Sequence, residues 1–176
     1  MSSRNRVLSA VAVAVFAMAV STGCGYERKV KRLDNQEFQH YYALKVYMDE
    51  PQRKAFFKLK TRAERDEFLK KRGHWDKFYE YEPHIRDAIF DGKVELGWTK
   101  DMVLMAWGLP VDRGRVAGRQ ATRSERYKYR FEETQDGGVL VWEPGSKTQY
   151  AAARLFSREV IFDNDVVAEI NNKDEF

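Results

Sequence analysis

Aromatic and basic side chains alternate along one short stretch of the chain. The aromatic ones are Tyr127, Tyr129 and Phe131, and the basic ones Arg126, Lys128 and Arg130. Because successive strand residues point to opposite faces, this pattern predicts an antiparallel strand with one buried face. Further strands are predicted over Val139–Glu143, Gln149–Phe162 and Val166–Ile170, separated by turn residues at Gln135–Gly138, Pro144–Ser146 and Asp163–Asp165. Residues 151–154 fit a helix equally well.

Earlier in the chain the apolar spacing is helical. Phe38 to Tyr81 is expected to form helices, with Pro51 in the first turn of one of them. Thr61 and Glu64 match a capping box, and the helix behind them is expected to run to Tyr79. Gly73 is its weak point, since glycine costs about 1 kcal/mol relative to alanine inside a helix. Another helix is predicted from Pro83 to Asp91, closed by Gly92.

The stretch ELGWTKDMVLMAWGLPVD, residues 95–112, predicts a helix of two to three turns. Thr99 is a good N-cap, and Asp101 complements the helix dipole in the first turn. Trp107 belongs to the apolar face. Gly108 can close the helix, and Pro110 cannot continue it. A helix this short needs a partner surface, so we expect a packing element rather than a catalytic loop. The preceding Gly97 and Trp98 complete the segment, with Trp98 expected to pack on the first turn as a hydrophobic staple.

These elements predict an α+β fold, in which N-terminal helices precede a short helix packed on a three- to four-stranded antiparallel meander. The expected divisions are a signal peptide over 1–23, a polar tether over 24–37, a helical segment over 38–92, an α+β domain over 93–172 and a frayed tail over 173–176.

The N-terminus predicts export. Arg4 and Arg6 precede an apolar run from Val7 to Val20, too short to span a bilayer, which takes about 20 apolar residues. Cys24, the single cysteine, follows this run and resembles the bacterial lipoprotein signal. That resemblance implies cleavage before Cys24, a lipid on its thiol, and an outer-membrane anchor facing the periplasm. The alternative is ordinary secretion with cleavage near Ala19, which leaves Cys24 a free thiol.

Charge narrows the choice of partners. The formal net charge is +4, and part of it lies in the expected signal peptide. The remainder is too small, and too interleaved with acidic residues, to favour nucleic acid. A basic, glycine-containing loop is predicted from Asp112 to Arg123. Its arginines are candidates for binding an acidic partner surface, and the alternative is a mobile basic hairpin; they are Arg113, Arg115, Arg119 and Arg123.

Catalytic chemistry is weakly represented. The three histidines, His40, His74 and His84, are expected on helix surfaces, and their spacing matches no metal-site pattern. Four scattered carboxylates leave a catalytic pair open as an alternative; they are Asp112, Glu143, Asp163 and Asp165. No nucleophile or phosphate-binding motif occurs in the sequence. We therefore expect no enzyme activity, no metal and no cofactor.

Two resemblances follow from these segments. The region from Gly97 to Ile170 resembles the SmpA/OmlA domain, the BamE-type fold. The matching residues are Gly97, Thr99, Val103, Gly108, Pro110, the strand around Tyr127–Tyr129, and Val160–Val167. That resemblance implies a lipoprotein that acts as an accessory scaffold in β-barrel protein assembly.

The second resemblance is to the bacterial GWxTD domain, a family without a settled role. It rests on Phe56, Leu59, Glu64–Asp66, Phe68–Leu69, Gly97–Trp98, Asp101, Gly108 and Pro110. A strand over Met102–Trp107 would favour this interpretation.

The expected function is therefore a lipid-anchored envelope protein that binds other envelope proteins without catalysis. The alternatives are a GWxTD-like module, or a periplasmic hydrolase or glycan-binding protein that uses His74 or His84.

Overall fold

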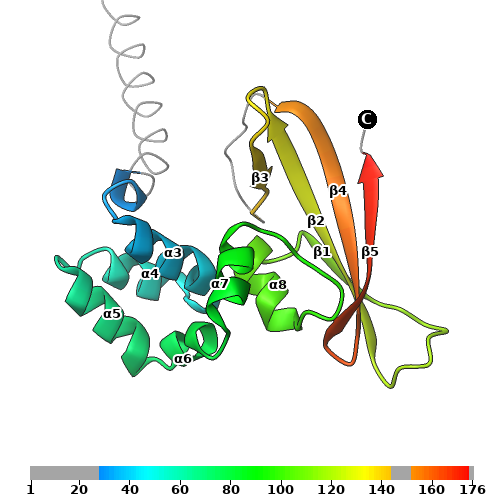
Figure 1. The fold of residues 1–176 in the computed structure, drawn as a ribbon, viewed down its shortest axis with the longest axis horizontal. Coiled ribbons are helices and arrows are strands. Elements are labelled where there is room, and N and C mark those ends of the chain that lie inside the picture. Colours follow the sequence, from blue (N-terminus) through cyan, green and yellow to red (C-terminus); the bar gives the residue numbers. More distant parts are fainter. Residues whose placement is uncertain (1–27, 144–151, 175–176) are drawn as a thin grey trace, which may run out of the picture. The chain divides into compact units, whose positions relative to one another are not determined.

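The strictly alternating strand is the one on which the sheet is built. A computed structural model describes residues 28–143 and 152–174 (Figure 1). It contains strands β1 Asp112–Arg115, β2 Ser124–Thr134, β3 Val139–Val141, β4 Ala152–Asp163 and β5 Val166–Asp174. All pairings are antiparallel, in the order β1-β2-β4-β5, and β3 pairs with β2. Since β4 takes one edge of β2 along its length, β1 and β3 share the other edge.

The α+β class with an antiparallel sheet is confirmed, and the sheet has one strand more than expected in the described part of the chain. The additional strand is β1, where a loop was predicted from Asp112 onward. Val111 donates its amide to the Lys128 carbonyl, and Asp112 to Arg115 then pair with Lys128 to Glu125. The sequence does not predict this strand, because its residues, DRGR, show no alternation of apolar and polar side chains.

The predicted tail also needs correction at its start. Lys173 and Asp174 pair with Ser157 and Phe156 at the end of β5 rather than fraying. The turn predicted at Asp163–Asp165 is confirmed, because Asn164 and Asp165 both adopt positive φ, 49° and 67°. Two successive residues of this kind make the tight hairpin turn whose twist suits paired strands. The turn predicted at Pro144–Ser146 and the first residues of the strand predicted from Gln149 lie outside the described residues.

The helices are α3 Asn35–Leu44, the 3₁₀ helix η1 Lys45–Tyr47, α4 Glu50–Phe56, α5 Arg62–Lys71, α6 His74–Tyr79, α7 Pro83–Phe90 and α8 Lys100–Trp107. The predicted caps are confirmed. Thr61 and Glu64 form a reciprocal capping box, and Pro51 and Pro83 stand in the first turns of their helices. Gly92 has φ +68° just after α7.

Two helix boundaries differ from expectation. The helix predicted from Thr61 to Tyr79 is broken at Gly73, whose φ of +66° is left-handed, so that α5 ends and α6 starts anew. The predicted tether over 24–37 is wrong at its end, because α3 begins at Asn35. Asp34 and Glu37 accept each other's backbone amides, which makes a further capping box upstream of Phe38.

By its contacts the chain divides into two units, Met1–Phe38 and Gln39–Phe176. In the second unit, His40 fastens three helices together and is 1% exposed, which corrects its expected surface position. Its Nδ1 lies 3.2 Å from Asp66 of α5, and its Nε2 lies 2.6 Å from the Tyr79 hydroxyl of α6. Both ring nitrogens are therefore satisfied, as burial of a polar group requires. The sequence gives no sign of this burial, because the two partners of His40 lie 26 and 39 residues further along the chain.

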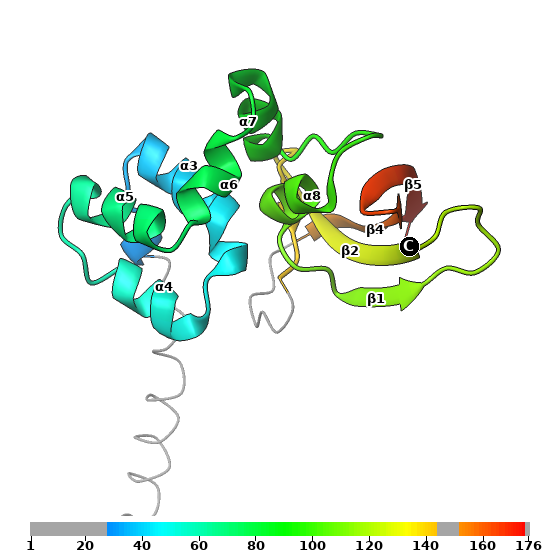
Figure 2. The ribbon, with the colours of Figure 1, turned by 90° about the horizontal axis from the view of Figure 1, so that it is seen from below.

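Figure 2 shows α8 over one face of the sheet beside β2. The aromatic side chains of β2 form that face: Tyr127, Tyr129 and Phe131 are all buried, as the alternation predicts. Trp107 of α8 packs edge-on against Tyr129 and Phe131, with ring centroids 5.2 and 5.0 Å apart. The helix that is too short to be stable alone thus docks on an aromatic sheet face.

Candidate functional site

The segment around Gly97–Trp98 joins α8 to the C-terminal hairpin. The Gly97 amide donates to the Val167 carbonyl at 2.9 Å, and the Val167 amide donates to the Trp98 carbonyl at 2.8 Å. Thr99 forms an isolated bridge with Val166 and caps α8 through the Met102 amide. Trp98 is 5% exposed. These residues therefore extend the sheet edge next to β5 and set the direction of α8.

The other end of α8 is equally structural. The Trp107 Nε1 donates to the Gly92 carbonyl at 2.9 Å, and Trp107 is 3% exposed. Gly108 has φ +74°, a conformation that favours glycine, and its carbonyl accepts from the Tyr129 hydroxyl at 3.4 Å. Pro110 follows at the turn into β1. The tryptophan-bracketed segment is thus a packing element between helices and sheet, as predicted, and its indoles are buried.

Asp101 has a role that its expected dipole interaction did not suggest. Its carboxylate accepts a hydrogen bond from the Tyr47 hydroxyl at 2.9 Å, and Lys77 lies 3.8 Å away. Burial and this carboxylate raise the pKa of the Tyr47 phenol above its usual range. Asp101 therefore links α8 to η1 and α6 and is not available as a free acid.

The residues of the hydrolase hypothesis do not converge. Among the described residues, no three metal-binding side chains group together. His74 stacks on Tyr47 with centroids 6.0 Å apart, its buried Nε2 has no hydrogen-bond partner, and burial lowers its pKa. His84 is exposed at the start of α7. Neither histidine is hydrogen-bonded to a carboxylate of the described ranges that could orient it as a base.

The candidate carboxylates are all held in ion pairs. They pair as Asp112 with Arg126, Glu143 with Lys45, Asp163 with Arg119, and Asp165 with Lys100. The Arg119 hydrogen bonds lower the pKa of Asp163, and the Lys100 hydrogen bond lowers that of Asp165. A general acid at neutral pH needs the opposite shift. The arrangement therefore favours structural roles for these four groups.

The predicted basic loop separates into two parts. Arg119 binds Asp163 through Nε and Nη2 at 2.8 Å each and also pairs with Glu169. Arg123 pairs with Glu125, and its backbone amide donates to Asn164. These contacts tie the loop to the β4–β5 turn, so it is not the free basic hairpin of the alternative interpretation. Arg113 and Arg115 differ, since neither forms an ion pair within the described part of the chain.

Arg113 and Arg115 line an open hollow of about 450 Å³, which we call the arginine pocket. Its lining residues are Arg113, Gly114, Arg115, Arg123, Glu125 and Tyr127. The Arg113 guanidinium lies 5.1 Å from the centroid of the Tyr127 ring. Both arginines are exposed, and they stand two residues apart on β1, so their side chains leave the same face of the strand.

The one carboxylate of the arginine pocket is already neutralised. Glu125 binds Lys100 at 2.6 Å through one oxygen and Arg123 through the other. The Lys100 hydrogen bond lowers the pKa of Glu125, which keeps its carboxylate charged. Both carboxylate oxygens are already bound by these two cations. Arg113 and Arg115 therefore leave the pocket with uncompensated positive charge. Such a surface attracts an acidic partner.

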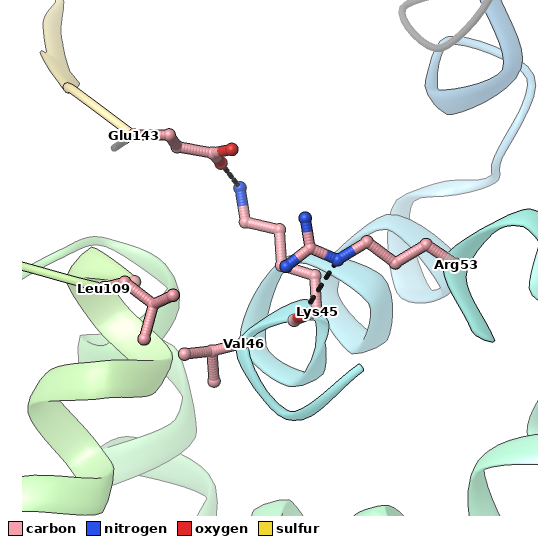
Figure 3. A pocket seen from close by; sticks show the side chains of 6 residues that line it. Lys45, Val46, Arg53, Leu109 and Glu143 are labelled. Carbon is pink, nitrogen blue, oxygen red and sulfur yellow. Dashed lines mark hydrogen bonds and ion pairs between the residues drawn. The ribbon is translucent and has the colours of Figure 1, made fainter. Parts of the chain in front are cut away.

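A second hollow lies beside α8 and is shown in Figure 3. Lys45 extends across it to Glu143, and Arg53 donates from Nε to the carbonyls of Lys45 and Met48 at 3.2 and 3.0 Å. Its volume is about 70 Å³, and Val46, Gly108 and Leu109 complete the lining. This volume is far below the roughly 300–1,000 Å³ of ordinary ligand sites, so the hollow suits water better than a substrate.

Cys24 and the rest of the predicted signal peptide lie outside the described residues. Within residues 28–143 and 152–174, every helix is too short or too polar to serve as a membrane span. Comparisons with protein-family models, curated proteins and solved structures gave no match. What is known of the protein's class therefore comes from its own structure. It is an α+β domain with an arginine-lined pocket beside β1 at the edge of its sheet.

Proposed function

We propose that this is a lipid-anchored protein of the bacterial cell envelope that binds other proteins and catalyses no reaction. Its anchor is a lipid on Cys24, which follows a positive and then an apolar segment typical of exported lipoproteins. The placement at the outer membrane, facing the periplasm, follows from the same resemblance. The folded domain then meets its partners close to the membrane surface.

The observation that carries the binding role is the unpaired charge of Arg113 and Arg115 in the arginine pocket. Side chains at alternate positions of a strand are about 6–7 Å apart, which matches carboxylates at alternate positions of an extended acidic segment. Arginine can bind each carboxylate through two parallel hydrogen bonds. The partner feature that fits is therefore an extended segment with acidic residues two apart.

Residues Met102–Trp107 are helical, which supports the BamE-type interpretation. A strand at these residues would have supported the GWxTD-like interpretation instead. By the BamE-type resemblance, the process served is outer-membrane assembly, with this chain as an accessory scaffold. The hydrolase alternative gains no support from the scattered positions of His74 and His84 and from the paired carboxylates.

A photo-crosslinking amino acid at position 113 or 115 of the full chain, expressed in bacterial cells, tests the proposal. We expect a defined protein adduct from these positions and none from Glu67, which is exposed on α5. A crosslinker at position 123, an exposed residue of the same pocket, should form the same adduct in the parent chain and lose it in the double variant Arg113→Glu, Arg115→Glu.

The matched control is Lys58→Glu, Lys60→Glu, which reverses two exposed charges of the same spacing outside the arginine pocket. It should leave the adduct intact. Absence of any adduct at 113 and 115, or an equal loss in the control variant, contradicts the proposal.

A further inference from the structure

Strand β1 lies at the edge of the sheet, where Figure 2 shows it beside β2. Its Gly114 stands opposite Arg126, and just past its end the Val116 amide donates to the Ser124 carbonyl at 3.0 Å. Along an antiparallel pair, residues that bond to the neighbouring strand alternate with residues that do not. Asp112, Gly114 and Val116 therefore direct their backbone groups to β2.

Arg113 and Arg115 are the intervening residues, so their N–H and C=O groups point away from β2. These groups have no hydrogen-bond partner in the part of the chain that the structure describes. Both arginines are exposed, and among the described strands none lies beyond β1. A sheet edge with unpaired donors and acceptors is a template for a further strand.

The same two residues supply the unpaired charge of the arginine pocket. Arg113 stands opposite Tyr127, and both residues line this hollow of about 450 Å³. A strand that is added to β1 directs its side chains to the same two faces of the sheet as β1 does. Its residues opposite Arg113 and Arg115 therefore point to the face on which the pocket opens. The free backbone groups and the free charges can thus be satisfied by one extended segment.

We propose that the partner's acidic segment binds by adding an antiparallel strand to the outer edge of β1. This inference rests on the proposed function, because it states how the arginine pocket holds the partner. Two acidic residues, two positions apart, lie opposite Arg115 and Arg113. Each exchanges both backbone hydrogen bonds with its arginine and places its carboxylate beside the guanidinium. The residue between them faces the other side, beside Gly114, which has no side chain to restrict it.

A second copy of this chain is a poorer occupant of the edge. In a symmetric pair of β1 strands centred on Gly114, Arg113 of one copy would stand opposite Arg115 of the other. Like charges directly opposite one another destabilise a sheet. The basic side chains of this short edge strand therefore hinder self-association and still admit an acidic strand.

Nuclear magnetic resonance on the ¹⁵N-labelled full chain tests strand addition with a synthetic peptide, N-acetyl-Thr-Glu-Val-Glu-Thr-amide. We expect saturable binding. At saturation, the exchange of the Arg113 and Arg115 amides with water should slow by about tenfold or more, because each amide gains an acceptor. The Gly114 amide should change less, since it is already bonded to β2.

Two singly N-methylated peptides separate the backbone bonds from the charge. In antiparallel addition the amides of both glutamates point to β1, and the valine amide points away. A methyl group on the nitrogen of the first glutamate should weaken binding by about fivefold or more, because one bond is lost at the strand interface. A methyl group on the valine nitrogen adds the same mass and leaves the charge unchanged, and it should alter affinity by less than about twofold.

The charge is tested with the double variant Arg113→Gln, Arg115→Gln, which keeps the backbone of β1. It should bind the peptide about tenfold more weakly, the scale of lost charge-assisted hydrogen bonds. The matched control Lys58→Gln, Lys60→Gln removes two exposed charges outside the pocket and should retain binding within about twofold.

The failure of strand addition is distinguishable from the failure of the proposed function. Peptide binding without slowed exchange at Arg113 and Arg115, or equal weakening by the two methyl groups, overturns strand addition. The proposed function then stands, because the charges alone hold the partner. Absence of peptide binding also overturns strand addition. The proposed function fails separately, if crosslinkers at positions 113 and 115 capture no protein in cells.

Discussion

The indole of Trp107 donates a hydrogen bond to the backbone carbonyl of Gly92, 2.9 Å away. One side chain thereby connects the last turn of α8 to the end of α7, while its ring packs against Tyr129 and Phe131 of the sheet. The two residues approach closely, because a Cβ added to Gly92 would lie 3.6 Å from this indole nitrogen. The helical and sheet parts of the domain therefore meet at Trp107.

Replacement of Trp107 should destabilise the domain strongly. Trp107→Ala removes a buried ring and leaves a cavity, which costs about 3–5 kcal/mol in protein cores. Trp107→Phe keeps much of the ring but leaves the Gly92 carbonyl without its donor, and should cost less. Urea unfolding followed by circular dichroism measures both. A Trp107→Ala variant with an unchanged midpoint would show that the indole does not support the fold.

Gly73 should resist substitution for conformational reasons alone. A Cβ there meets no atom within 4 Å, but φ is +66°, which L-residues adopt at a cost of about 1–2 kcal/mol. Gly73→Ala is therefore expected to lower the free energy of unfolding by that amount. Gly114→Ala is the control, because Gly114 has no positive φ and its Cβ would make only ordinary contact with Arg126. Equal thermal shifts in the two variants would contradict this account.

The bond between Arg119 and Asp163 should make stability depend on acidity. Hydrogen bonds from Arg119 and Ser124 hold the pKa of Asp163 below its ordinary value. A depressed folded-state pKa stabilises the fold above the unfolded-state pKa, and this contribution is lost as pH falls through the folded-state pKa.

Arg119→Met should therefore unfold at lower urea than the parent chain at pH 7. The difference should shrink as the pH is lowered below the ordinary range of aspartate. A difference that stays constant down to pH 2 or so would assign the effect to packing instead of charge.

Cys24→Ser should move the protein from the membrane to the soluble fraction of bacterial cells. A multiply acylated cysteine buries many methylene groups in the bilayer. The polar tether beside it has few apolar side chains that could replace them. Fractionation with mass spectrometry of the mature N-terminus measures both localisation and modification. Membrane retention of the serine variant would exclude lipid as the anchor, and a mature chain starting near residue 20 would favour ordinary secretion.

Much of the local structure could be predicted from the sequence, because short-range signals determined it. The capping box at Thr61, the prolines at helix starts and the alternation along Tyr127–Phe131 each depend on neighbouring residues only. Strand β1 could not be predicted, since DRGR becomes a strand only through pairing with β2. Gly73 is a weak point of the predicted helix, and the structure uses it to end α5 in a left-handed conformation that glycine adopts readily.

The candidate sites were predictable only in part. Composition pointed to the arginines of residues 113–123, but not to which of them are neutralised. Arg119 finds its acidic partners 44 and 50 residues later in the chain, and sequence spacing gives no sign of this.

The junction between Gly97–Lys100 and the β4–β5 turn has a consequence for biosynthesis. The amides of Gly97 and Lys100 donate to the carbonyls of Val167 and Asp165, which lie 70 and 65 residues later in the chain. While the ribosome is still translating this chain, α8 has no completed sheet edge on which to start. The N-terminal end of α8 can therefore be joined to the sheet only after β5 has been made, and the export that we propose would precede this last set of contacts.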